Sequence, residues 1–331
     1  MSASAYKKRL FDVVASMLWQ QWISLGVAGH GEGEGSAVVL DPEALLIFSA
    51  SFCRYDSRLY DLVATWLVKY SRLLNPVRLK TMVAEGTHVD LPSLAYLAAL
   101  CVQAGDKRWQ KMAEAHCATG AEPQSMFLAV EDAAGFYCRQ QDELALRYGF
   151  IRPPFENRNK ICRRLPLTPA TLLLRARGWV GSTARAEVIV LLLQSAATIQ
   201  QLSARSGFVR SAVKSVLDEF MLTDIVSPVK LDGRGTSYTL NDKKHFRELW
   251  ECPHVHFPCW KEIFNALADL WQLVSSPAFA VVSQETFHGE LRRLFRARLR
   301  PRLLNCGVNV FESLTESSII RLPELFRSGE V

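Results

Sequence analysis

Four side chains that could bind a transition metal lie within one short segment: Cys252, His254, His256 and Cys259. Thiolates and imidazoles are the ligands that Zn²⁺ prefers in proteins. The spacing C-x-H-x-H-x-x-C is not a standard zinc pattern, however, and a tetrahedral site built from it would force a tight, strained loop. Two prolines and flanking aromatic residues favour a rigid connector between helices instead. We therefore expect no cofactor and keep these four residues as the metal candidates.

A glycine-rich segment at residues 29–35 is the second place where the sequence could do chemistry. It superficially resembles a phosphate-binding loop, but it follows a predicted helix rather than a strand. It also lacks the Lys-Ser/Thr and G-x-G-x-x-G continuations that such loops have. The sequence has no G-x-S-x-G, H-E-x-x-H or C-x-x-C motif, and its other histidines are isolated. We interpret the segment as a linker and expect that the protein is not an enzyme.

Positive charge is concentrated in two segments. Residues 152–185 contain eight basic side chains and one acid, in a region whose prolines exclude one continuous helix. Residues 290–302 contain six arginines and one acid, with apolar residues along one side, which predicts a basic amphipathic helix. Both segments could contact nucleic-acid phosphates. The alternatives are a solvated connector for the first and, for the second, a docked surface helix or one that binds a membrane surface or an acidic partner.

The remaining patterns predict a mainly α fold with four parts. Residues 1–150 form a helical N-terminal domain, in which Asp41-Pro42-Glu43 combines three signals for a helix start. Residues 151–182 form a basic, proline-containing connector and helix. Residues 183–241 form a helix-turn-helix with a two-stranded hairpin, and residues 242–331 form a C-terminal helical region.

Residues 183–241 carry the clearest functional signal. Thr198-Ile-Gln-Gln fits a capping box, and Gly207 allows a sharp turn between two helices. Residues 209–221 then repeat apolar residues at helical spacing. Two β-branched-rich segments follow, at 224–230 and 236–240, joined by a turn that contains Asp-Gly. The polar face of the third helix contains five residues: Arg210, Ser211, Lys214, Ser215 and Asp218.

The pattern Ile199-x-x-Leu202-x-x-x-x-Gly207-x-x-x-x-x-Val213-x-x-x-Leu217, followed by that hairpin, resembles the winged helix-turn-helix of ArsR-like and MarR-like bacterial transcription regulators. The resemblance implies that residues 209–221 enter the major groove of double-stranded DNA. It implies base contacts for Arg210, Ser211, Lys214 and Ser215. Phosphate contacts are expected for Arg234 at the wing tip and for Arg163, Arg164, Arg292 and Arg296.

Two features depart from this pattern and support a second hypothesis. Val209 occupies the position where many such helices have a Ser or Thr cap. Residues 198–241 contain five basic side chains against four acidic ones, so this part is almost neutral. The alternative is a winged-helix module that binds a protein partner, as an antitoxin or assembly factor does, without binding a specific DNA sequence.

Composition narrows the class of protein further. A chain of 331 residues with 49% hydrophobic and 22% charged residues and a net charge of +6 is globular rather than disordered. Its longest charge-free apolar stretches are shorter than the roughly 20 residues that span a bilayer. With no signal-peptide pattern, we expect a cytoplasmic protein without membrane contact, whose cysteines are reduced. We also expect a homodimer, because paired half-sites require two-fold symmetry, with apolar faces of residues 259–273 and 287–300 as core or dimer seam.

Overall fold

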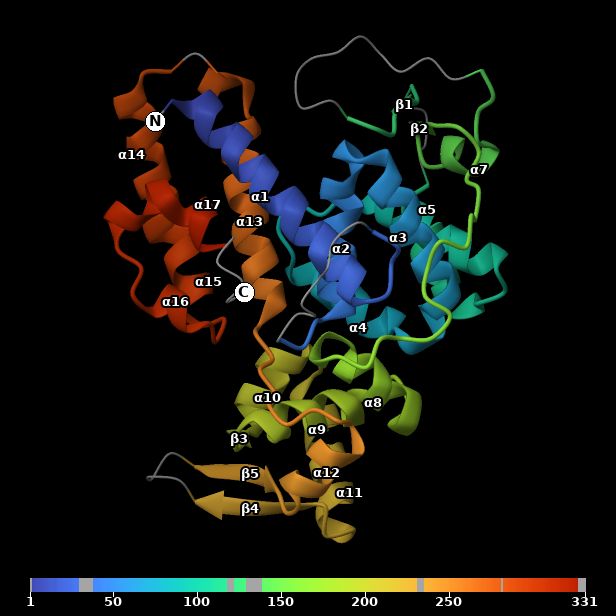
Figure 1. Cartoon of the computed structure of the whole chain (residues 1–331), viewed down its shortest axis with the longest axis vertical. Coiled ribbons are helices and arrows are strands. Elements are labelled where there is room, and N and C mark those ends of the chain that lie inside the picture. The colour runs from blue at the N-terminus through green and yellow to red at the C-terminus, as the bar shows by residue number, and fades with distance from the viewer. Residues whose placement is uncertain are drawn as a thin grey trace.

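A computed structural model describes residues 2–29, 38–117, 122–128, 139–230, 235–280 and 282–326 (Figure 1). The described residues are mainly helical and include one small antiparallel sheet, which confirms the predicted mainly α class. Across these ranges, no helix is long and apolar enough to cross a membrane.

Helices dominate the first half of the chain, where several helix starts are specified locally. Asp41, Asn75 and Asp90 each cap a helix that has proline in its first turn, and each accepts hydrogen bonds from backbone N–H groups there. Gln124–Ser125 (β1) pairs in parallel with Phe150–Ile151 (β2). The helices are α1 (Ala3–Ser24), α2 (Pro42–Phe52), α3 (Ser57–Tyr70), α4 (Pro76–Glu85), α5 (Leu91–Gln103), α6 (Gln110–Glu114) and α7 (Glu143–Leu146).

A smaller helical unit with a three-stranded sheet follows and forms the lower part of Figure 1. The sheet has the order β3-β5-β4, and both strand pairs are antiparallel. The short β3 was not predicted, because two residues are too few to show an alternating pattern. The elements are α8 (Leu172–Val180), α9 (Ala184–Gln194), β3 (Ala197–Thr198), α10 (Ile199–Ser206), α11 (Arg210–Leu222), β4 (Val226–Lys230), β5 (Thr236–Leu240) and α12 (Lys243–Leu249).

The C-terminal helices return to the first half of the chain. Helix α13 packs on α1 and α2, and α17 packs on α1 (Figure 1). The hydroxyl of Tyr6 donates to the carbonyl oxygen of Ile319, so the two ends of the described chain are in contact. The helices are α13 (Trp260–Ser275), α14 (Gln284–Leu294), a π-helical turn (Phe295–Leu299), α15 (Arg300–Leu304), α16 (Asn309–Glu312) and α17 (Leu322–Leu325).

This packing corrects one basis of the dimer prediction. The apolar residues of α13 and of the helix over 287–299 are buried within the chain, in one contiguous hydrophobic cluster. Their stripes therefore pack against α1, α2 and one another and are not available as a dimer seam. Helical spacing shows that a face is apolar but does not show what covers it.

Five charged side chains meet where the first helices join the smaller unit: Asp41, Glu43, Arg78, Arg177 and Glu187. Each is at most 4% exposed. Arg78 of α4 donates to Asp41 at 2.5 and 2.8 Å and to Glu43 at 2.7 Å. Arg177 of α8 donates to Glu43 at 2.7 and 2.9 Å and to Glu187 at 2.5 Å. We call these five residues the buried ion cluster.

The two arginines affect the acids of the buried ion cluster differently. Burial would raise the pKa of Asp41, but the adjacent Arg78 guanidinium outweighs burial and holds that pKa below its ordinary value. Burial raises the pKa of Glu187, and the two guanidinium groups offset only part of this effect. Arg78 also donates from Nε to the carbonyl oxygen of Ser206 at 2.5 Å. The cluster thereby holds the end of α10, and the start of α11 beyond it, against α4.

Candidate nucleic-acid interface

Helix α11 is amphipathic in the way that its sequence predicts. Its apolar residues Val213, Val216, Leu217 and Phe220 are buried against the smaller unit. Four polar residues of its N-terminal half are exposed together: Arg210, Ser211, Lys214 and Ser215. The helix lies at the lower end of the molecule, near β4 and β5 (Figure 1). The structure therefore brings the four residues predicted to contact bases onto one solvent-facing surface.

The two halves of α11 differ in charge. The N-terminal half carries Arg210 and Lys214, whereas Asp218 and Glu219 follow in the next turns. Glu219 forms an exposed ion pair with Arg185, the residue after the start of α9. Val209 precedes the helix and provides no side-chain cap for its first N–H groups. The basic, uncapped end of α11 is thus the part that is electrostatically suited to an anion.

The basic residues of 152–185 do not form the continuous strip that their sequence suggests. Arg152 is 1% exposed and donates to Asp61 at 2.7 Å, and Arg177 belongs to the buried ion cluster. Arg175 donates to two backbone carbonyl oxygens, and Arg158 pairs with Glu156. In sequence these charges are adjacent, but carboxylates from distant helices neutralise several of them. The exposed basic residues of this segment that have no acidic partner in the described chain are Lys160, Arg163 and Arg164.

Arg163 and Arg164 lie beside the first helices rather than beside α11. The carbonyl oxygen of Cys162, next to them, accepts hydrogen bonds from Lys69 at 2.8 Å and Tyr70 at 3.0 Å, at the end of α3. Both arginines are exposed. They lie in a segment without helix or strand and not on the surface formed by the four residues of α11.

Among the C-terminal arginines, those of α14 lie far from α11. Helix α14 is at the opposite end of the long axis of the molecule (Figure 1). Arg292 and Arg296 are both exposed, and Arg296 pairs with Glu316. Three further arginines, Arg293 of α14, Arg298 of the π-helical turn and Arg302 of α15, pair with Glu290, Asp269 and Glu262, respectively. Most of the positive charge of residues 290–302 is therefore neutralised within the chain, and a short duplex on α11 would not reach α14.

Arg234, the remaining residue predicted to contact phosphate, lies outside the described residues. Strands β4 and β5 are described on both sides of residues 231–234.

The cysteine and histidine side chains at 252–259 do not converge. Cys252 and Cys259 are buried, whereas His254 is exposed and His256 is half-buried. The thiol of Cys252 donates to the carbonyl oxygen of His254 at 3.2 Å. Within the described ranges, no group of three or more His, Cys, Asp or Glu side chains is placed to hold a metal ion. Next to this segment, the rings of Trp179, Phe246 and Trp250 pack together.

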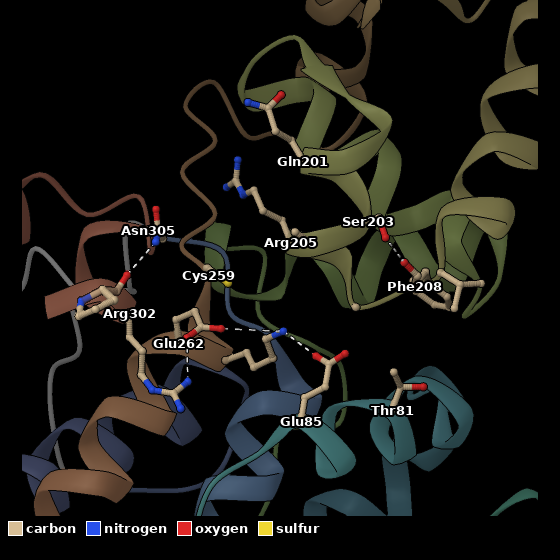
Figure 2. Close-up of a pocket in the computed structure, with 15 residues that line it drawn as sticks. Thr81, Glu85, Gln201, Ser203, Arg205, Phe208, Cys259, Glu262, Arg302 and Asn305 are labelled. Atoms are coloured by element: carbon tan, nitrogen blue, oxygen red, sulfur yellow. Dashed lines mark hydrogen bonds and ion pairs between the residues drawn. The ribbon is translucent and has the colours of Figure 1, made fainter. Parts of the chain in front are cut away.

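A large cleft beside the start of α11 was not anticipated from the sequence. It has a volume of about 910 Å³ and is lined by residues of α4, α10, α13 and α15 and by Phe208 and Val209 in the turn before α11 (Figure 2). No local pattern could mark it, because its walls come from four separate parts of the chain.

Comparisons of the chain with family models, curated proteins and solved structures found no match.

Proposed function

We propose that this protein is a DNA-binding transcription regulator that binds double-stranded DNA through a winged helix-turn-helix formed by residues 183–241. One observation carries the proposal: Arg210, Ser211, Lys214 and Ser215 are exposed together on the N-terminal half of a helix whose opposite face is buried. A helix that is anchored in this way can enter the major groove without losing its packing. The glycine turn before it and the antiparallel hairpin after it agree with the same arrangement.

The side-chain chemistry suits base contacts. Arg and Lys donate to the O6 and N7 acceptors of guanine, and Ser hydroxyls can both donate and accept. Neither Arg210 nor Lys214 has an ion-pair partner among the residues that the structure describes. Their charges are therefore available to a nucleic acid without the cost of breaking an internal salt bridge.

Fluorescence anisotropy with a labelled duplex selected from random sequence tests the proposal. Affinity should fall steeply with salt, with a log-log slope of about −0.9 for each neutralised phosphate. Arg210→Ala and Lys214→Ala should each cost about 1–3 kcal/mol on the selected site and less on a scrambled duplex. Arg292→Ala is the matched control, because Arg292 is an exposed arginine of α14, and this helix lies at the other end of the long axis from α11 (Figure 1).

Two results would contradict the proposal. One is the absence of DNA binding at low salt, or an affinity that does not change with salt. The other is that the Arg210 and Lys214 variants bind like the parent, in which case α11 does not contact the bases.

A protein partner is the second candidate function, and two exposed apolar side chains at the ends of α11 favour it. Leu222 is 88% exposed and Val209 is 63% exposed, so each offers apolar surface that a protein partner could cover. A pull-down from the native host would distinguish the candidates. A stoichiometric protein that is lost with Leu222→Ser, without enriched DNA, would support this second function.

The homodimer remains part of the proposal, because regulators of this kind bind two half-sites related by a two-fold axis. Since the faces of α13 and α14 are covered within the chain, the dimer must use a different surface. Light scattering at micromolar concentration should give twice the mass of one chain, and a strict monomer would contradict this part.

A further inference from the structure

The cleft beside α11 lies between the helix-turn-helix and two other parts of the molecule. Gln201 and Arg205 project into it from α10, one helical turn apart (Figure 2). Helix α4 forms a second wall, and the starts of α13 and α15 form the third. Its volume of about 910 Å³ is within the range of small-molecule sites. A ligand in this space would touch all three walls at once.

Most charged groups of the cleft already have partners. The Lys261 ammonium lies 2.8 Å from Glu85, and the Arg302 guanidinium lies 2.9 Å from Glu262 (Figure 2). These two pairs leave the walls locally neutral. They also hold the walls together, because one pair joins α13 to α4 and the other joins α15 to α13.

Arg205 is the exception among the charged residues that line the cleft. Its Nη2 donates to the side-chain oxygen of Gln194 at 2.9 Å and to the carbonyl oxygen of Phe257, both of which are neutral acceptors. No carboxylate in the described ranges pairs with it, and its Nε and Nη1 donate to none of the groups described there. Burial lowers the pKa of Arg205. A half-buried cation with free donors is stabilised when an anion binds beside it.

The surroundings of Arg205 add no negative charge at this end of the cleft. Burial lowers the pKa of the neighbouring His256 imidazole, and the Arg205 charge lowers it further. Ala204, Phe208, Val209 and Pro301 provide apolar surface on the walls. The site therefore combines one unpaired guanidinium with apolar contacts for the body of a ligand.

We propose that this cleft binds a small organic anion, with one carboxylate, sulfonate or phosphate group on Arg205 and an aromatic or apolar body against Phe208 and Pro301. The bound molecule would connect α10 to α13 and α15, and so hold the start of α11 in one position. Ligand binding is independent of the proposed function. We also expect the bound molecule to change the affinity for DNA. This second effect rests on the proposed function, because it requires that α11 contacts DNA.

The test is a titration with 8-anilinonaphthalene-1-sulfonate, a fluorescent aromatic monoanion, on the full chain in the absence of DNA. One dye should bind per chain and be displaced by phenyl phosphate. Arg205→Gln should weaken binding at least about tenfold, because a charge-assisted hydrogen bond is lost. Arg158→Gln removes the same charge from an exposed arginine outside the cleft and should bind the dye like the parent.

A second variant covers the case in which Arg205→Gln does not fold. Ala204→Trp places a large ring in the cleft from an exposed position on α10 and removes no hydrogen bond, so it should abolish dye binding while circular dichroism stays unchanged. The proposal is overturned if the parent does not bind the dye, if folded Arg205→Gln binds it normally, or if Arg205→Gln does not fold and folded Ala204→Trp binds it normally. Because these titrations contain no DNA, failure of DNA binding would leave this result intact.

Discussion

Replacing Arg177 by Met should destabilise the protein strongly, because it removes one of the two cations of the buried ion cluster. Arg177 donates to Glu43 at 2.7 and 2.9 Å, to Glu187 at 2.5 and 3.1 Å and to the carbonyl oxygen of Leu73 at 3.0 Å. In Arg177→Met, Arg78 alone faces three buried carboxylates. Breaking a buried pair on one side costs about 3–5 kcal/mol, so we expect a loss of this size in the free energy of unfolding.

Glu187→Gln should behave in the opposite way, although it changes the same contact. The cluster contains three acids and two arginines, and Oε2 of Glu187 is buried with no hydrogen-bond partner among the described groups. Burial also raises the pKa of Glu187, so the fold disfavours its charged form. Glutamine keeps the size and an oxygen acceptor for Arg177. We expect a cost of no more than about 1 kcal/mol.

Urea unfolding at pH 7, followed by circular dichroism, measures both changes. Arg158→Met is the control, because the Arg158–Glu156 pair is 70% and 71% exposed and should contribute less than about 0.5 kcal/mol. If Glu187→Gln costs as much as Arg177→Met, the cluster needs all three negative charges and our account of its charge balance is wrong. If neither variant differs from the control in its free energy of unfolding, the cluster does not stabilise the contact between the first helices and the smaller unit.

Three further predictions concern single residues. Thr198→Ala removes the capping box of α10 and should lower the free energy of unfolding by about 1 kcal/mol in urea titrations, whereas Thr198→Ser should not. Gly207→Ala forces a side chain into a backbone with φ +74° and should cost about 1–2 kcal/mol, with an equal stability loss at low and high salt because no charge changes. The Arg108 guanidinium lowers the pKa of Asp106 to about 2 through a side-chain hydrogen bond. Since this is below the unfolded value of about 4, the stabilisation is complete above pH 4 and is lost as the pH falls towards 2. Asp106→Asn should therefore be less stable than the parent at pH 7 and approach it only as the pH falls below about 2; a constant difference would contradict the assignment.

The sequence by itself determined the helices of residues 183–241 and which face of α11 is polar. These features depend on interactions within one or two turns, namely the Thr198–Gln201 capping box, the left-handed Gly207 and the 3.6-residue spacing of apolar residues. The start of α2 at Pro42 was predictable for the same reason, because its cap and proline are adjacent in sequence.

Only the tertiary structure decided which charges are free. Arg177 lies in the segment with the largest positive charge, yet its partner Glu43 is 134 residues away, and the pair is fully buried. Arg163, in the same segment, is exposed and has no ion-pair partner in the described chain. A count of charges along the sequence cannot distinguish these two cases, since burial and ion pairing depend on which helices come together. The same holds for the cleft around Arg205, whose walls are adjacent only after α4, α10, α13 and α15 have packed.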